Sequence, residues 1–346
     1  MQEARMHARR GDRLALALAA GLGLGALLLA LIDPRAAFTG YMGACVPFAA
    51  IPAGAFCLMA MMTLIPGAWG EELRLTCEAG SLLALPALAA FTPVMLASPF
   101  IYPWAHEPPA SPFQAIWLGP VPFAIRTVLW FALLWFASRE VRSRRRTRAV
   151  SAAGLVLFPI LGSLAAIDWL MALDLKFASS AFGLQILILS VGLAFAVLLL
   201  FRLCSGSAPY RPGVLGGLLL ALLLMWAYIQ SLTFFISWSA GLPDGAAWYL
   251  RRTGGWAMAS VAFGLLGGVP LLMLMLTRFR NSPLWLARLC TAVIAGKLVE
   301  FAWFAVPGTG VLGIAAYTLA LAAFSLLATI GLSIALRRRV DARRPA

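Results

Sequence analysis

Ten apolar stretches, each about as long as a helix must be to cross a bilayer, constrain what this chain can fold into. They cover residues 14–32, 41–65, 79–97, 121–137, 149–173, 181–203, 214–239, 256–276, 285–306 and 311–336. Of the 346 residues, 62% are hydrophobic and only 12% are charged, and the mean hydropathy is +0.91. Because a water-soluble domain could not expose so apolar a surface, we expect an all-α integral membrane protein with about ten transmembrane helices.

The distribution of basic residues predicts that both termini are cytoplasmic. On that topology, 21 of the 27 Lys and Arg residues lie on the inner side. The others are Arg35, Lys176, Arg251 and Arg252 in outer loops, and Arg126 and Lys297 within spans. This asymmetry follows the positive-inside rule, so the net charge of +14 needs no nucleic-acid partner. We expect a single membrane domain over 14–336 between basic cytoplasmic tails at 1–13 and 337–346.

Cysteine and histidine usage predicts that this chain binds no metal and no haem. The five cysteines lie in or near spans and form no CxxC or CxxCH motif. The two histidines, His7 and His106, fall in the first tail and in an outer loop, which excludes a span-buried bis-histidine haem. We therefore identify no catalytic residue and no metal ligand in the sequence.

Four ionisable side chains, Arg126, Asp168, Lys297 and Glu300, lie inside predicted spans. A charge at the centre of a bilayer costs about 2.5–3.5 kcal/mol on insertion scales, so such residues face a protein interior, a cavity or a partner charge. At about 1.5 Å rise per residue, Asp168 lies about 8 Å and Glu300 about 9 Å below the outer ends of their helices. Gln230 and Thr233 fall near the same depth. We therefore expect the fifth, seventh and ninth spans to converge on a shared wet pocket.

Two interpretations of this polar layer remain open. In the first, Asp168 and Glu300 exchange protons beside a water-filled cavity, with their acidity tuned by burial and by a nearby cation. In the second, Lys297 and Glu300, three residues apart on one helical face, simply pair, while Arg126 snorkels outward or pairs with Asp168.

The segment AAIDWLMALDLKFASSAFG, residues 165–183, resembles the region around the fifth span of the second large membrane subunit of alternative complex III, a bacterial quinol:cytochrome c oxidoreductase. Further stretches agree with this family in the same order along the chain. They are GAWGEELRLTCEAG (67–80), IYPWAHE (101–107), ISWSAGLPDGAAWYLRR (236–252) and KLVEFAWFAVP (297–307). The resemblance covers residues 41–307, and the ordered set is more specific than any one piece.

This resemblance implies a fold similar to NrfD-like, polysulfide-reductase-type subunits: two four-helix bundles, 41–173 and 181–306, with one flanking helix at each end. It also implies a multi-pass protein of the bacterial inner membrane that carries no cofactor itself. Haem and iron–sulfur clusters would belong to partner subunits, and quinone is a candidate ligand. The part implied for such a subunit is energy coupling, through polar residues that form a proton half-channel.

By position, the family's polar pattern matches Asp168, Ser179, Ser180, Asp244 and Glu300. Together with Lys297, Arg126, Thr233 and Gln230, these residues are our candidates for a proton path. The family's aromatic positions match Trp169, Trp238, Trp248 and Tyr249. An interfacial aromatic belt and a helix cap at Asp244 would explain the tryptophans and this aspartate without any function.

The chain also departs from the family pattern. Thr63 and Lys176 stand where the family often has histidines, Thr233 replaces a glutamine, and Gly245 replaces an acidic residue. Loss of protonatable groups favours a mainly structural subunit. Two alternatives therefore stay open beside the proton half-channel: a scaffold that holds cofactor-bearing subunits, and a ten-helix secondary transporter that binds an ionic solute through Lys297, Glu300 and Arg126.

Overall fold

The computed structural model describes residues 2–107, 111–143, 147–205, 209, 211–239 and 243–341, and within these ranges its regular elements are all helical. The long helices are α1 (Gln2–Leu28), α2 (Pro34–Leu64), α3 (Ala68–Gly80), α4 (Ala84–Leu96), α7 (Pro120–Ser143), α8 (Thr147–Trp169), α9 (Phe182–Leu203), α10 (Pro212–Ser239), α12 (Gly255–Met275), α14 (Pro283–Ala305) and α15 (Gly310–Asp341). Short elements are η1 (Leu29–Leu31), η2 (Ser81–Leu83), α5 (Ser98–Ile101), η3 (Pro103–Ala105), α6 (Pro112–Trp117), η4 (Met171–Leu173), α11 (Pro243–Leu250) and α13 (Thr277–Arg280).

The expected all-α membrane fold is confirmed. Nine helical segments among the described residues are long and apolar enough to cross a membrane. The remaining predicted span, 285–306, coincides with α14, which is 23 residues long but also carries Arg288, Lys297 and Glu300. At 1.5 Å per residue, α14 extends about 35 Å, so its length also suffices for a crossing.

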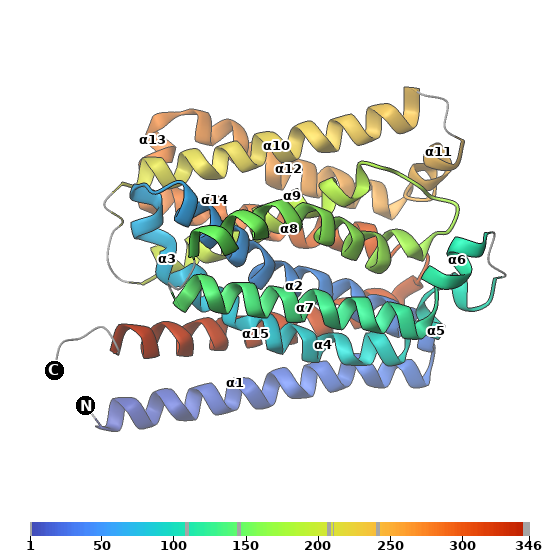
Figure 1. Cartoon of the computed structure of the whole chain (residues 1–346), viewed down its shortest axis with the longest axis horizontal. Helices are drawn as coiled ribbons and strands as arrows, with labels where there is room; N and C mark the ends of the chain where they lie inside the picture. The colour runs from blue at the N-terminus through green and yellow to red at the C-terminus, as the bar shows by residue number, and fades with distance from the viewer. Residues whose placement is uncertain are drawn as a thin grey trace.

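The long helices run side by side, and the beginning of α1 lies at the same end of the bundle as the end of α15 (Figure 1). Arg337 of α15 pairs with Asp12 of α1 at 3.4 Å, which joins these two helices near that end. The short elements α5, α6 and α11 lie at the opposite end (Figure 1). We call the first end the terminal end and the second the loop end.

Some predicted boundaries differ from the structure. α1 begins at Gln2, so helix extends through the predicted tail 1–13, and α15 continues to Asp341 within the predicted tail 337–346. Residues 342–346 of that tail lie outside the described ranges. The third span begins at Ala68 rather than at residue 79, because α3, η2 and α4 form one helical segment of membrane-crossing length, Ala68–Leu96. Within α3, Arg74 pairs with Glu78 at 3.1 Å, and Glu72 pairs with Arg202 of α9.

The central helix is α2, which is buried along nearly its whole length and contacts helices from all parts of the chain. α2 packs with α4, α7 and α8, which follow it in the chain, and also with α9 and α14. α10 and α12 complete the group around α9 and α14, while α15 lies between α1 and α2. α2 is apolar around its full circumference, as expected of a helix surrounded by protein.

Close packing around α2 depends on glycines that face neighbouring helices. A Cβ atom on Gly40 would overlap the carbonyl oxygen of Gly313 in α15, and one on Gly54 would overlap the Ala194 side chain in α9. Because lipid supplies little hydrophobic force between helices, close van der Waals contact through small residues stabilises such a bundle.

We expect Gly40→Ala to lower the free energy of unfolding by about 1–3 kcal/mol, because the added methyl group forces α15 away from α2. The measurement is the thermal unfolding midpoint of the purified protein in detergent. Gly21→Ala in α1 is the matched control, because a Cβ there meets nothing within 4 Å. Equal midpoints for the two variants would contradict this packing.

Candidate functional site

The first intramembrane charge pair joins α7 to α8. Arg126 Nε donates to Asp168 Oδ2 at 2.6 Å, and its Nη2 donates to Oδ1 at 3.0 Å, so the pair is bidentate. The Trp117 indole donates to the same Oδ1 at 3.2 Å. The Arg126 guanidinium lies 4.2 Å from the Trp117 ring centroid and donates to the Trp117 carbonyl at 2.9 Å. α6 therefore closes over the pair from the loop end.

Asp168 is only 4% exposed and lies next to a tryptophan-rich part of the core. The adjacent Trp169 indole donates to Thr127 at 3.2 Å, and its ring packs against Phe91 and Trp130. Asp168 and Arg126 also line one end of a pocket of about 150 Å³ between α7 and α8. The aromatic core around Trp169 therefore shields one side of the Asp168 carboxylate, and the pocket lies on its other side.

Tyr102, which follows α5, ties the loop end to this site. Its hydroxyl donates to the Trp169 carbonyl at 3.1 Å. Burial, followed by the nearby Asp168 carboxylate, raises the pKa of the Tyr102 phenol well above its usual value. The phenol therefore stays protonated and remains a hydrogen-bond donor at any physiological pH.

The second intramembrane pair is fully buried between α9, α10, α12 and α14. Lys297 Nζ donates to Glu300 Oε2 at 3.2 Å, and the side chains of this pair are 2% and 1% exposed. The Trp226 indole of α10 donates to both Glu300 oxygens, at 2.9 and 3.0 Å. Lys297 Nζ also lies 3.5 Å from the Trp226 ring centroid, so this one tryptophan contacts both charges.

Trp226 reaches the pair because Gly267 of α12 leaves room for its ring. A Cβ atom on Gly267 would lie 2.6 Å from the far edge of that ring. Gly192 of α9 faces the Lys297 stem, with a Cβ position 4.0 Å from Cε. These glycines therefore allow close helix packing, and this packing positions the Lys297–Glu300 ion pair.

The other predicted polar residues of α10 make separate contacts. Gln185 of α9 donates to Gln230 at 2.5 Å. The Thr233 hydroxyl donates to the backbone carbonyls of Ile229 and Gln230, at 3.0 and 3.1 Å. In the described part of the chain, neither side chain is hydrogen-bonded to Asp168 or Glu300.

The remaining predicted site residues lie at the loop end and are not brought to the charge pairs. Ser179 and Ser180 belong to the connection between η4 and α9, and Asp244 is exposed in the first turn of α11. An acidic residue there faces the positive end of the helix dipole, as a capping role requires. Trp238 is 61% exposed near the end of α10, which is typical of an interfacial aromatic residue.

Trp248 and Tyr249 instead pack into the protein around Arg252. The Arg252 guanidinium lies 3.3 Å from the Trp248 ring centroid and donates to the carbonyls of Trp303, Trp248 and Phe304, at 3.1, 2.9 and 3.3 Å. Two of these carbonyls end α14, where a cation is favoured by the helix dipole. Burial, followed by the neighbouring Arg251, lowers the pKa of Arg252.

A third polar cluster lies toward the terminal end, and its residues were not among the predicted site residues. Arg74 of α3 pairs with Glu78 and donates to the Thr63 hydroxyl at 3.2 Å and to the Val141 carbonyl at 3.1 Å. Arg142 of α7 donates to Ser81 at 2.6 Å. Thr63, one of the departures from the family pattern, thus joins α2 to α3.

The structure brings the four charges together as two pairs and not as one polar layer. No hydrogen bond or ion pair among the described residues joins Asp168 or Arg126 to Glu300 or Lys297. The first pair adjoins a pocket between α7 and α8, whereas the second is enclosed by four other helices. Of the two interpretations above, pairing is the one that these contacts support.

Trp117 and Trp226 are the contacts that sequence analysis missed. Trp117 lies in a proline-rich connection between two predicted spans, and Trp226 lies in an otherwise apolar span. The one available signal for Trp226 is a tryptophan in the middle of a span, away from either interface, where its N–H needs a buried acceptor.

Comparisons with known proteins assign no family and no function to this chain. No protein-family model and no curated protein matches the chain. Within the described ranges, no group of three or more His, Cys, Asp or Glu residues is placed to hold a metal ion.

We expect Lys297→Met to lower the free energy of unfolding by about 3–5 kcal/mol, because it leaves the Glu300 charge buried without its cation. The double variant Lys297→Met/Glu300→Leu should recover most of that loss. A double-mutant cycle of unfolding in detergent measures the coupling. Arg251→Gln is the control, since its pair with Asp174 is exposed and exposed pairs contribute about 0–1 kcal/mol. Additive effects at 297 and 300 would show that the two residues do not interact.

We also expect Arg126→Lys to destabilise the protein by about 1–3 kcal/mol. Lysine cannot bond both Asp168 oxygens and the Trp117 carbonyl from one planar group. Arg139→Lys is the matched control on α7, because Arg139 is exposed and lies 5.6 Å from the Trp135 ring centroid. Thermal unfolding midpoints in detergent test this prediction. Equal shifts of the midpoint in both variants would contradict a structural role for the bidentate Arg126–Asp168 pair.

Proposed function

We propose that this chain is a membrane subunit of an alternative-complex-III-like quinol:acceptor oxidoreductase in the bacterial inner membrane. It would not catalyse electron transfer alone, since the haem and iron–sulfur clusters would belong to partner subunits. The ordered resemblance over residues 41–307 motivates the proposal. The observation that carries it is that Asp168 and Glu300, both within resembling segments, each lie in a helix of membrane-crossing length with a cation and a tryptophan indole as partners.

This arrangement supports a role in energy coupling. A carboxylate held by a cation and an indole N–H can take up a proton if the cation moves away, because the remaining low-dielectric surroundings favour the neutral acid. Asp168 adjoins a pocket through which water could supply that proton, and Arg126 is its movable partner. Glu300 would change its charge only with a rearrangement of Lys297 and Trp226.

A scaffold role is the second candidate. Both carboxylates accept hydrogen bonds from a cation and an indole, and the Lys297–Glu300 pair is almost fully buried. Such pairs can fix helix register without moving any proton. The two candidates differ in what happens when a carboxylate is replaced by its amide.

To test the assignment, the tagged chain would be purified in mild detergent from its native membranes. We expect it to carry haem-containing and iron–sulfur subunits and to reduce an acceptor with quinol. A chain that purifies without any redox cofactor and without quinol oxidation would contradict the proposal.

To test coupling, Asp168→Asn and Glu300→Gln would be compared in the reconstituted complex. We expect acceptor reduction to continue while the number of protons moved per electron falls. Glu107→Gln is the matched control, since Glu107 is exposed at the loop end and is not among the proton-path candidates. Unchanged proton movement in both amide variants would exclude a proton path through these residues. Loss of assembly with normal coupling in the residual complex would identify the scaffold role.

A further inference from the structure

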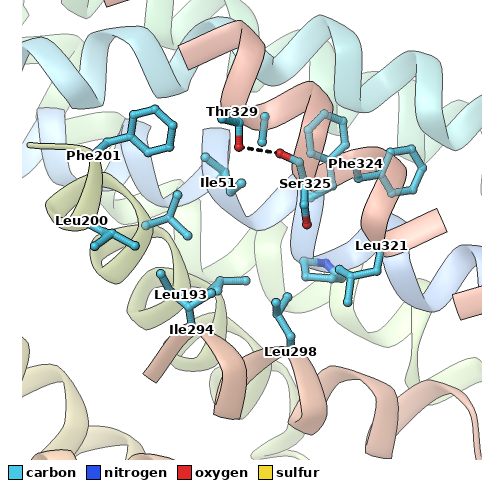
Figure 2. Close-up of a pocket in the computed structure, with 14 residues that line it drawn as sticks. Ile51, Leu193, Leu200, Phe201, Ile294, Leu298, Leu321, Phe324, Ser325 and Thr329 are labelled. Atoms are coloured by element: carbon cyan, nitrogen blue, oxygen red, sulfur yellow. Dashed lines mark hydrogen bonds between the residues drawn. The ribbon is translucent and has the colours of Figure 1, made fainter. Parts of the chain in front are cut away.

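A cavity of about 190 Å³ lies between α2, α9, α14 and α15, and its lining includes none of the four charged residues of the two pairs. Figure 2 shows side chains from these helices pointing into a common space, with Leu193 and Ile294 on one side and Phe324 on the other. Toward the loop end, Tyr317 of α15 donates to the Leu298 carbonyl of α14 at 2.6 Å. The cavity is therefore bounded by a hydrogen bond where the two helices meet.

The chemistry of the wall indicates an apolar occupant. The lining holds no charged side chain, and its only hydroxyl groups are those of Ser325 and Thr329. The Thr329 hydroxyl already donates to the Ser325 carbonyl at 2.7 Å (Figure 2). Ordered water needs two to four polar partners, so this space does not suit water. Ser325 and Thr329 are exposed, which leaves the cavity open to the side, toward lipid.

The position of the cavity along the helices indicates what kind of apolar molecule it holds. Thr329 lies eight residues from Arg337 and Ile294 six residues from Arg288, so the cavity is about 12 Å and about 9 Å from these arginines along their helices. Both arginines lie toward the terminal end and both are exposed. An apolar cavity at the depth of the acyl chains suits the tail of a phospholipid, and exposed arginines nearer the membrane surface suit its anionic headgroup.

We propose that this cavity holds one acyl chain of an anionic phospholipid whose phosphate lies beside Arg288. Arg288 suits this role because it is exposed and lies 5.1 Å from the Trp285 ring centroid, an aromatic residue of the kind found at membrane interfaces. The chain would fill the gap between α14 and α15, against the central helix α2. This proposal depends only on the membrane fold, so it stands apart from the proposed redox complex.

The test uses the full chain, purified in mild detergent and exchanged into vesicles of equal phosphatidylglycerol and phosphatidylcholine. Native mass spectrometry then counts the lipids that stay bound. We expect the wild type to retain about one phosphatidylglycerol per chain in preference to phosphatidylcholine. Arg288→Gln should reduce that preference about fivefold, since one basic side chain near the surface contributes about that factor. Ala328→Phe, which fills the cavity, should abolish retention of either lipid.

Two controls separate this site from general lipid contact. Arg278→Gln removes another exposed arginine, on α13 near the terminal end, and Leu265→Phe enlarges an exposed residue of α12 that does not line the cavity. Both variants should retain phosphatidylglycerol as the wild type does. A thermal unfolding midpoint for each variant shows that it is folded. Equal retention in Ala328→Phe and wild type, equal retention of the two lipids by the wild type, or a bound quinone that Ala328→Phe displaces would each overturn the proposal.

Discussion

A charge inside a bilayer must find its counter-charge within the protein, and the packing of this bundle reflects that requirement. The Arg126–Asp168 and Lys297–Glu300 pairs lie in different groups of helices, yet each follows the same plan. One carboxylate accepts from a cation and from a tryptophan indole, while the same tryptophan ring lies against the cation. Desolvation of both charges is offset by direct pairing, by the indole hydrogen bond and by the attraction between the cation and the ring.

The two pairs differ in what they can do. Asp168 adjoins a pocket and has a partner, Arg126, whose side chain is 20% exposed, so exchange with water needs only a small movement. Glu300 is enclosed by four helices, and Gly267 allows Trp226 to close over it. If protons move through this chain, Asp168 is the accessible site, and a change of charge at Glu300 requires helices to separate.

The helical membrane fold could be predicted from hydropathy alone, because a run of about twenty apolar residues has few alternatives in a bilayer. Pairing of Lys297 with Glu300 could also be predicted, since they lie three residues apart on one face of a helix. Trp117 and Trp226 could not, because they reach the carboxylates through tertiary packing that sequence spacing does not encode. The separation of the charges into two pairs could not be predicted for a related reason: equal depth in the membrane does not determine which faces of two helices meet.

The charge state of Glu300 in the resting protein tests most directly whether buried pairing organises the bundle. Infrared spectra of wild type and Glu300→Gln, with isotopically labelled glutamate, separate an ionised carboxylate from a protonated carboxyl group. If Lys297 and Trp226 hold Glu300 as an ion, the difference spectrum shows the loss of carboxylate bands alone. Loss of a protonated carboxyl band in Glu300→Gln would show that Glu300 is neutral, and the ion pair would not exist.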